Sequence, residues 1–184
     1  MPIIMSINKL IVCSLFTALI AVLAQIAIPL PFSPIPFTGQ ILGVLLAGII
    51  LGSKHSALSI VAYLLLGAAG APVFSLARGG IYMLIGPTGG YLWGFIPAVM
   101  YAGLVSKHSE NKSRLWFVVA LLPALALIYT FGAVQLSLIM GYTVQQVLLI
   151  GVLPYIPLDL LKVILSIFLG TKIKKSLQQN RLLP

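Results

Sequence analysis

Residues 115–140, LWFVVALLPALALIYTFGAVQLSLIM, contain no acidic or basic side chain. An apolar run of about 18 residues or more is typical of a helix that crosses a membrane. Strands of a membrane barrel would instead alternate apolar and polar residues over segments of about ten. The run therefore predicts a transmembrane helix, and further apolar runs occupy most of the chain on both sides of it.

The composition indicates the same class of protein. Of the 184 residues, 60% are hydrophobic and 7% are charged, whereas about 25% of the residues in a soluble domain are charged. The mean hydropathy is +1.15. Because so few polar side chains cannot cover a water-facing globule, we predict an all-α integral membrane protein. The length suits about six helices of about 20 residues, so residues 1–184 are expected to form a single six-helix transmembrane domain.

Breaks in the apolar pattern separate the expected helices. Proline, glycine and short polar segments mark these breaks. The expected spans are 9–28, 38–52, 57–70, 87–106, 115–140 and 155–171, and a short helix is expected at 143–153. Residues 53–56 are expected to form a tight polar turn. The first span is expected to be retained rather than cleaved as a secretory signal, since the run stays apolar beyond Gln25.

Two connections between the expected spans are irregular. Residues 29–36 contain four prolines, which exclude a regular helix and predict a stiff, extended loop. Residues 71–85 are too apolar for a free loop and too broken by glycine and proline for a helix. Non-helical backbone at membrane depth is tolerated only where protein buries it or where it lines a cavity. We therefore expect re-entrant or irregular external loops that lie against the bundle.

Basic residues set the expected orientation. The net charge is +9, and with six spans most basic residues fall on the side that holds both termini. Lysine and arginine favour the cytoplasmic side of a membrane, so the N and C termini are expected to be cytoplasmic. The residues on this side are Lys9, Lys54, Lys107, Lys112, Arg114, Lys172, Lys174, Lys175 and Arg181. Because topology explains this charge, the expected partner is the lipid membrane and not nucleic acid.

Asp159 and Lys162 lie within an expected transmembrane span, where the positive-inside rule does not explain a charged residue. Asp159 is one of only two acidic residues in the chain, and a separation of three positions brings both side chains to one face of a helix. A charged side chain at the bilayer centre costs about 2.5–3.5 kcal/mol on insertion scales, so the pair is expected to face the protein interior. Two interpretations follow: a pair that binds a ligand, and a self-satisfied ion pair that fixes helix register.

A third charge outside the topology rule is Arg78, in the irregular connection at 71–85. Tyrosine, threonine and glutamine side chains near the same external end add polar groups on apolar bodies, as in a small-molecule site. The candidate substrate-binding residues are Asp159, Lys162, Arg78, Tyr82, Tyr91, Tyr155, Thr38 and Gln40.

Motifs for catalysis are missing from the sequence. It contains no G-x-x-x-x-G-K-[ST], so hydrolysis of ATP at a P-loop is excluded, and no H-E-x-x-H. The two histidines, His55 and His108, lie in the expected cytoplasmic turns, which argues against a metalloprotease or a serine–histidine hydrolase within the membrane. The single cysteine, Cys13, excludes a cysteine-rich metal site and an internal disulfide. We expect no catalytic residue, no metal and no cofactor.

Four stretches of the chain resemble the BioY family, the biotin-specific substrate-binding subunits of energy-coupling factor (ECF) transporters. They are PFSPIPFTGQ at 31–40 with LGVLLAG at 42–48, LLLG at 64–67 with GAPVF at 70–74, GPTGGY at 86–91, and P-x-D-x-x-K at 157–162. The resemblance covers nearly the whole chain. It implies six helices, capture of biotin from outside a bacterial cytoplasmic membrane, and contact of Asp159 and Lys162 with biotin. Which end of biotin each residue holds stays open.

The resemblance also implies a partner complex of a transmembrane coupling subunit and two ATP-hydrolysing subunits. The first helix of the family contacts the coupling subunit through small residues four positions apart, which let helices approach closely. In this chain the matching pairs are Ser14 with Ala18 and Thr17 with Ala21. The expected function is therefore biotin uptake as part of an ATP-driven transporter. The alternatives are a stand-alone biotin facilitator, a related subunit for another small vitamin and, least supported, an intramembrane enzyme.

Overall fold

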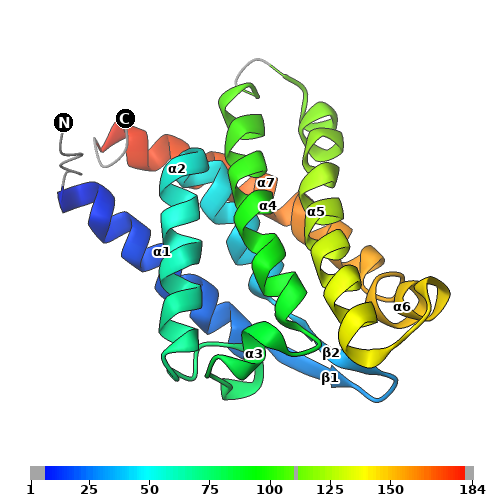
Figure 1. Cartoon of the computed structure of the whole chain (residues 1–184). Helices are drawn as coiled ribbons and strands as arrows, with labels where there is room; N and C mark the ends of the chain where they lie inside the picture. The colour runs from blue at the N-terminus through cyan, green and yellow to red at the C-terminus, as the bar shows by residue number, and fades with distance from the viewer. Residues whose placement is uncertain (1–6, 110–111, 181–184) are drawn as a thin grey trace.

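Five long helices dominate the computed structural model, which describes residues 7–109 and 112–180. They are α1 (Ile7–Gln25), α2 (Gln40–Ala68), α4 (Gly89–Lys107), α5 (Arg114–Met140) and α7 (Ile156–Gln179) (Figure 1). The shorter elements are the strands β1 (Ala27–Leu30) and β2 (Ser33–Thr38), the 3-10 turn η1 (Ser75–Ala77), and the helices α3 (Tyr82–Ile85) and α6 (Val144–Gly151).

The longest of these helices, α2, consists of two arms joined at Gly52. This residue has φ 72° and ψ 172°, a conformation that glycine adopts without the steric penalty of a side chain. One residue thus reverses the chain, and the two arms run in opposite directions (Figure 1). The tight polar turn predicted at 53–56 is therefore wrong. These residues already belong to the second arm, where the Ser56 hydroxyl donates to the carbonyl oxygen of Gly52 at 2.6 Å.

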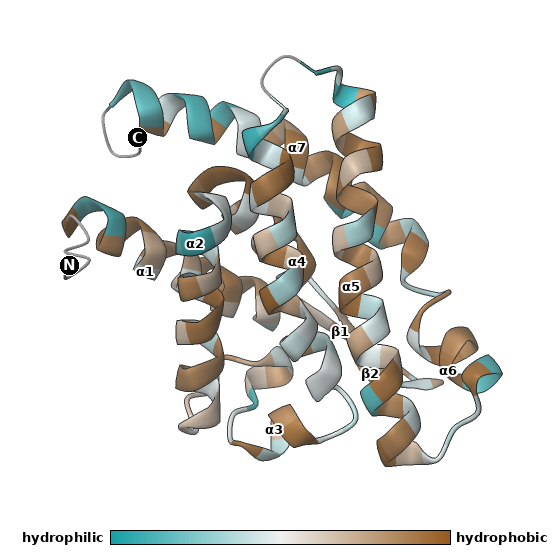
Figure 2. Ribbon diagram, turned by 45° about the horizontal axis from the view of Figure 1, so that its top comes forward, coloured by the Kyte–Doolittle hydropathy of each residue, from teal (hydrophilic) through white to brown (hydrophobic). Residues whose placement is uncertain are grey.

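With the arms of α2 taken separately, the described residues form six long helical segments, as the sequence predicts. By length and composition, α1 and α5 can each cross a membrane. α2 passes the same test only when its two arms are counted as one helix, and α6 with α7, bent by 54°, passes only when the two are taken together. Many large apolar side chains are exposed on the outer surface, and hydrophobic residues run along all the long helices (Figure 2). An apolar surface of this extent suits contact with lipid.

The proline-rich segment is extended, as predicted, but it is paired rather than free. β1 and β2 form an antiparallel ribbon in which Ala27 lies opposite Thr38 and Ile28 opposite Phe37. Proline lacks the N–H that a strand donates, and a two-stranded ribbon tolerates it because each strand has one unpaired edge. The sequence analysis missed this ribbon, since the prolines signal only the absence of helix. The ribbon lies at the same end of the bundle as α3 (Figure 1).

The ends of two helices differ from the prediction. α1 ends at Gln25 instead of residue 28, because the chain enters β1 at Ala27. α7 continues to Gln179 instead of ending at residue 171, because lysine, serine, leucine and glutamine are all compatible with a helix interior. The irregular connection predicted at 71–85 is confirmed; it holds only η1 and α3.

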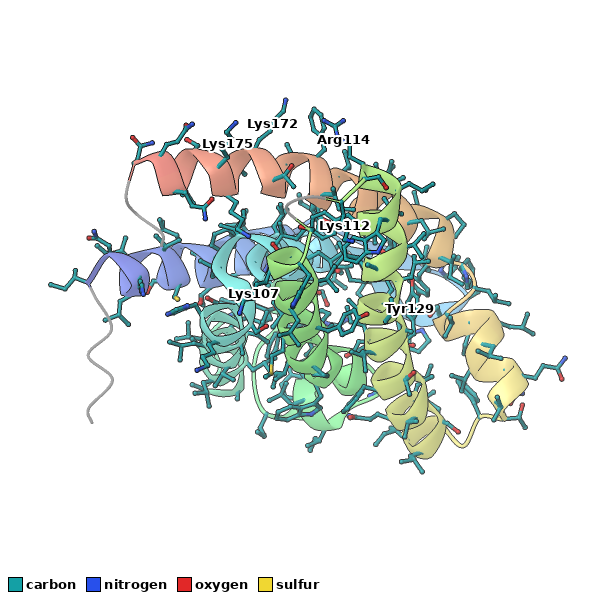
Figure 3. The ribbon with its side chains drawn as sticks, turned by 90° about the horizontal axis from the view of Figure 1, so that it is seen from above. Lys107, Lys112, Arg114, Tyr129, Lys172 and Lys175 are labelled. Carbon is teal, nitrogen blue, oxygen red and sulfur yellow. The ribbon has the colours of Figure 1, made fainter. Side chains whose placement is uncertain are left out.

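Basic residues gather at the end of the bundle opposite the ribbon. The start of α1 and the end of α7 lie there (Figure 1), and Figure 2 shows hydrophilic residues on the same end. One groove at this end is lined by Lys9, Lys54, Lys107 and Lys174, and a second by Lys112, Arg114, Lys174 and Lys175. Lys172 lies beside Arg114 and Lys175 (Figure 3). These bases therefore share one end of the bundle, as predicted; Arg181 lies outside the described residues.

Candidate functional site

A cavity lies at the ribbon end of the bundle, between β2, α2, α4, α5 and α7. Its residues are Ile35, Pro36, Phe37, Thr38, Gln40, Ile41, Phe74, Ser75, Met83, Thr88, Tyr91, Leu92, Phe95, Ile128, Tyr129, Gly151, Tyr155, Asp159 and Lys162. The free volume inside is about 60 Å³. Mostly apolar walls with a few convergent polar groups are typical of a small-molecule site.

Asp159 and Lys162 form the charged part of this cavity. Asp159 lies in the first turn of α7 and is 1% exposed. Lys162 Nζ donates to Asp159 Oδ1 at 2.7 Å and to the carbonyl oxygen of Thr38 at 2.6 Å. Lys162 Nζ also lies 3.7 Å from the centre of the Phe37 ring. The lysine thus connects α7 to the end of β2, and the positive end of α7 stabilises a carboxylate in its first turn.

Tyr129, which lies on α5 (Figure 3), is the third polar residue of this group. Its hydroxyl donates to Asp159 Oδ2 at 2.6 Å, so the two carboxylate oxygens have different partners. The sequence analysis missed this residue. A buried charge needs a hydrogen-bonded partner, and a buried tyrosine hydroxyl usually has one, but the chain alone does not show which tyrosine of another helix reaches Asp159.

Tyr91 and Tyr155, two of the candidate residues named from the sequence, both line the cavity. The Tyr91 hydroxyl donates to the carbonyl oxygen of Gly151 at 2.8 Å. The Tyr155 hydroxyl hydrogen-bonds to Ser33 Oγ at 2.9 Å and to the carbonyl oxygen of Ile35. Both hydroxyls therefore fasten neighbouring segments, α6 and β2, to the helices that carry the tyrosines.

Thr38 and Gln40 also line the cavity and belong to one chain of hydrogen bonds. The Thr38 hydroxyl donates to Gln40 Oε1 at 3.0 Å, and Gln40 Nε2 donates to the Tyr63 hydroxyl at 2.7 Å. Tyr63 in turn donates to the carbonyl oxygen of Val73 at 3.1 Å. This chain ties the end of β2 to both arms of α2 and to the segment that follows.

Arg78 and Tyr82 lie outside the cavity. Both side chains are exposed, Tyr82 by 57%, so their part in ligand binding stays a prediction. The residues of this connection that reach the cavity are Phe74, Ser75 and Met83. The backbone N–H of Phe74 donates to the carbonyl oxygen of Arg78 at 2.9 Å, which closes a tight turn and leaves the arginine side chain on the outer surface.

Gln25, the last residue of α1, holds this turn and was also missed. Its Nε2 donates to the carbonyl oxygen of Phe74 at 3.2 Å, and its Oε1 accepts from the Ala77 N–H at 2.9 Å. Leu76 and Ala77 have φ of 60° and 54°, which non-glycine residues rarely adopt. One amide side chain therefore bridges the backbone on both sides of Leu76. The only signal in the sequence is a lone polar residue at the end of an apolar run.

The four predicted partner-contact residues of α1 differ in burial. Ser14 and Ala18 are exposed, Ala21 is half-buried and Thr17 is buried. The Thr17 hydroxyl lies within hydrogen-bonding distance of the carbonyl oxygens of Cys13, at 3.1 Å, and Ser59, at 3.0 Å. This residue therefore packs against the second arm of α2. The outer face of α1 follows the register of Ser14 and Ala18.

The chemistry available in the cavity is that of polar recognition. It offers one carboxylate, one ammonium group, hydroxyls and one amide. Within 7–109 and 112–180, no three or more histidine, cysteine, aspartate or glutamate side chains are grouped so as to hold a metal ion. Such a set of groups suits a small ligand that presents both hydrogen-bond donors and acceptors.

Comparison with known proteins identifies the family. The BioY family matches residues 1–179. A biotin transporter BioY of Thermotoga maritima is 37% identical over 168 residues, which cover 91% of this chain and 96% of the relative. A biotin transporter BioY of Rhizobium etli is 33% identical over 174 residues, which cover 90% and 92% of the two chains.

A solved structure agrees with these relatives. The crystal structure of the S-component for biotin from an ECF-type ABC transporter matches with a TM-score of 0.84 at 28% identity, over 93% of this chain and 95% of the other. The agreement in sequence and in fold extends over nearly the full length of both chains. The chain therefore belongs to the BioY family.

Proposed function

We propose that this chain, as a single transmembrane domain, captures biotin at the outer face of a bacterial cytoplasmic membrane. It does so as the substrate-binding subunit of an ATP-driven ECF transporter. Its family consists of multi-pass membrane transporter components and not of enzymes. The observation that carries the proposal is the buried pair of Asp159 and Lys162, hydrogen-bonded to the half-buried Tyr129, in a mostly apolar cavity.

The hydrogen-bonding capacity of this group suits biotin. A carboxylate has about four acceptor sites and an ammonium group has three donors. Two acceptor sites of Asp159 and two donors of Lys162 are engaged within the protein. The free acceptor sites match the two ureido N–H groups of biotin. The free donor of Lys162 matches either the ureido oxygen or the valerate carboxylate, and the apolar walls match the bicyclic ring.

Entry of biotin requires movement of the segments around the cavity. The free volume of about 60 Å³ lies well below the roughly 300–1,000 Å³ of pockets that hold such ligands. The β-ribbon and the turn at 72–78 enclose the cavity from the outer end. We propose that both segments move away from the helices when the ligand enters and close over it afterwards.

Titration calorimetry on the purified chain tests the proposal. Biotin should bind tightly, and Asp159→Asn should weaken binding without unfolding the protein. Comparison of biotin with its methyl ester then shows which group of biotin Lys162 contacts. If Lys162 holds the carboxylate, Lys162→Met should bind biotin and its ester equally; if Lys162 holds the ureido oxygen, the preference for biotin should survive. Lys172→Met, exposed on the same helix, is the matched control. Absence of biotin binding by the unaltered chain would contradict the proposal.

We further propose that a transmembrane coupling subunit, together with two ATP-hydrolysing subunits, docks on the outer face of α1. The small, exposed Ser14 and Ala18 permit close approach of another helix. Ala18→Trp should reduce uptake and co-purification with the coupling subunit while the affinity for biotin stays unchanged. Leu138→Trp, exposed on α5, is the control. Equal uptake with and without the ATPase partners would favour a stand-alone facilitator.

A further inference from the structure

A second polar site lies at the opposite end of the bundle, where α5 begins and α7 ends. A groove of about 390 Å³ there is lined by the basic residues Lys112, Arg114, Lys174 and Lys175. The same groove carries the hydroxyls of Ser106, Ser109, Ser113 and Thr171. Figure 3 shows Arg114, Lys172 and Lys175 along the outer side of α7 and the start of α5, with Lys112 nearer α4. The groove thus combines four cations with four hydroxyl groups.

These cations have no acidic partner in the part of the chain that the structure describes. The one ion pair there joins Lys162 to Asp159. At about 1.5 Å per residue, Asp159 lies about 22 Å along α7 from Lys174. Lys174 Nζ donates to the neutral Ser106 hydroxyl at 3.1 Å. The preference for positive charge on the cytoplasmic side explains the side of the membrane, but not the convergence of four cations on one groove.

The start of α5 adds to the positive potential. Ser113 caps the helix, and its Oγ accepts from the backbone N–H of Trp116 at 3.2 Å. A helix N-terminus carries about half a positive charge and favours phosphate and other anions. The hydroxyls of Ser106, Ser109 and Thr171 already donate to backbone carbonyl oxygens. The cations and the helix terminus are therefore the groups that can bind a phosphate.

Apolar side chains beside the groove indicate what carries this phosphate. Leu115 is 74% exposed on the first turn of α5. Exposed Phe168 lies beneath two cations, with Arg114 and Lys172 at 5.9 Å and 4.1 Å from its ring centre. Basic pockets between helices on the cytoplasmic side suit anionic lipid headgroups. We infer that the groove binds the phosphate headgroup of an anionic phospholipid, with the acyl chains against the apolar side chains of α5 and α7.

Fluorescence quenching by brominated lipids tests this inference. The chain has two tryptophans, and Trp93→Phe leaves Trp116, whose ring centre lies 6.0 Å from Lys112 Nζ, as the reporter. In nanodiscs, quenching should be stronger with brominated phosphatidylglycerol than with brominated phosphatidylcholine at equal mole fraction. The combined variant Lys112→Gln/Arg114→Gln/Lys175→Gln should lower this preference at least about fivefold, the contribution of one basic residue near an anionic surface.

The matched control removes the same charge from the neighbouring groove. Lys9→Gln/Lys54→Gln/Lys107→Gln lies at the same end of the bundle and should leave the preference intact. Biotin binding should stay normal in both triple variants, so a failure here is distinct from a failure of the proposed function. Loss of the preference in both variants would overturn the inference, since attraction to the whole surface would then explain it.

Two further outcomes would also overturn the inference. Removal of the preference by millimolar inorganic phosphate in the buffer would identify a free anion as the occupant. Normal lipid preference in the first triple variant, together with loss of co-purification with the coupling and ATPase subunits, would identify an acidic protein surface instead.

Discussion

Lys162 and Lys174 lie on the same helix, α7, yet their surroundings differ in burial, partners and charge. Lys162 is 8% exposed, and its ammonium group contacts a carboxylate, a backbone carbonyl oxygen and an aromatic ring. Lys174 donates to a neutral hydroxyl and shares its groove with three other cations. Within 7–109 and 112–180, the fold thus supplies an anion to the first lysine and none to the second group.

The largest effect is expected from breaking the Lys162 pair. Lys162→Met alone should lower the free energy of unfolding in detergent by about 3–5 kcal/mol, because Asp159 is left buried without its cation. The double variant Asp159→Asn/Lys162→Met should recover most of this loss, since no charge remains. Denaturant titration measures the free energy of unfolding of both variants. The control Lys175→Met should leave the free energy of unfolding unchanged.

The same variants separate the two interpretations of the pair. A ligand-binding pair requires that the stable double variant still fails to bind biotin. A double variant that is stable and binds biotin normally would show that the pair only fixes helix register.

A smaller effect is expected from Tyr129→Phe, which removes one donor from Asp159. A hydrogen bond to a charged group contributes about 1.5–3 kcal/mol, so the Kd for biotin should rise by about 10- to 100-fold. Calorimetry measures the change. Tyr101→Phe on α4, which does not line the cavity, should leave the Kd unchanged. Equal effects of the two substitutions on the Kd would show that Tyr129 does not contribute to biotin binding.

Gln25→Leu should loosen the turn at the ribbon end without altering the charged group. The substitution removes two hydrogen bonds to the turn. Because each contributes about 1 kcal/mol, biotin should dissociate at least about fivefold faster. Hydrogen exchange at the amides of residues 74–78 should accelerate in parallel. Gln145→Leu, exposed on α6, provides the comparison. Unchanged exchange in the Gln25 variant would show that other contacts hold the turn.

The smallest effect is expected at the basic end. Lys172→Gln should change the Kd for biotin and the free energy of unfolding by no more than about 0.5 kcal/mol, as is usual for an exposed surface residue. The same calorimetry and denaturant titration apply. A clear loss of biotin affinity would mean that the basic end is coupled to the cavity through α7.

The sequence predicts the parts of this fold that rest on apolar runs and on isolated charges. The six helical segments follow from long stretches without charge, and the pairing of Asp159 with Lys162 follows from helix periodicity. The pairing of β1 with β2 cannot be predicted from the sequence, because the prolines exclude a helix but do not indicate which segments pair as strands. The sequence places the reversal at 53–56, whereas the structure places it at Gly52 alone. Many glycines do not adopt this backbone conformation, so the sequence does not show that 53–56 are helical.

The candidate site divides in the same way. Six of the eight residues selected from the sequence line the cavity, and Arg78 and Tyr82 do not. Being on the correct side of the membrane does not fix the direction of a side chain on an irregular turn. Tyr129 and Gln25 escaped notice because their partners lie far away in the chain, at Asp159 and at 74–77.

The two left-handed residues at the turn, Leu76 and Ala77, have an energetic consequence. This conformation costs a non-glycine residue about 1–2 kcal/mol, so the closed turn stores strain that opening would release. The amide of Gln25, at the end of α1, holds that strain in place. A small tilt of α1 that withdraws Gln25 would remove both hydrogen bonds, and the strain at Leu76 and Ala77 would then favour an open turn.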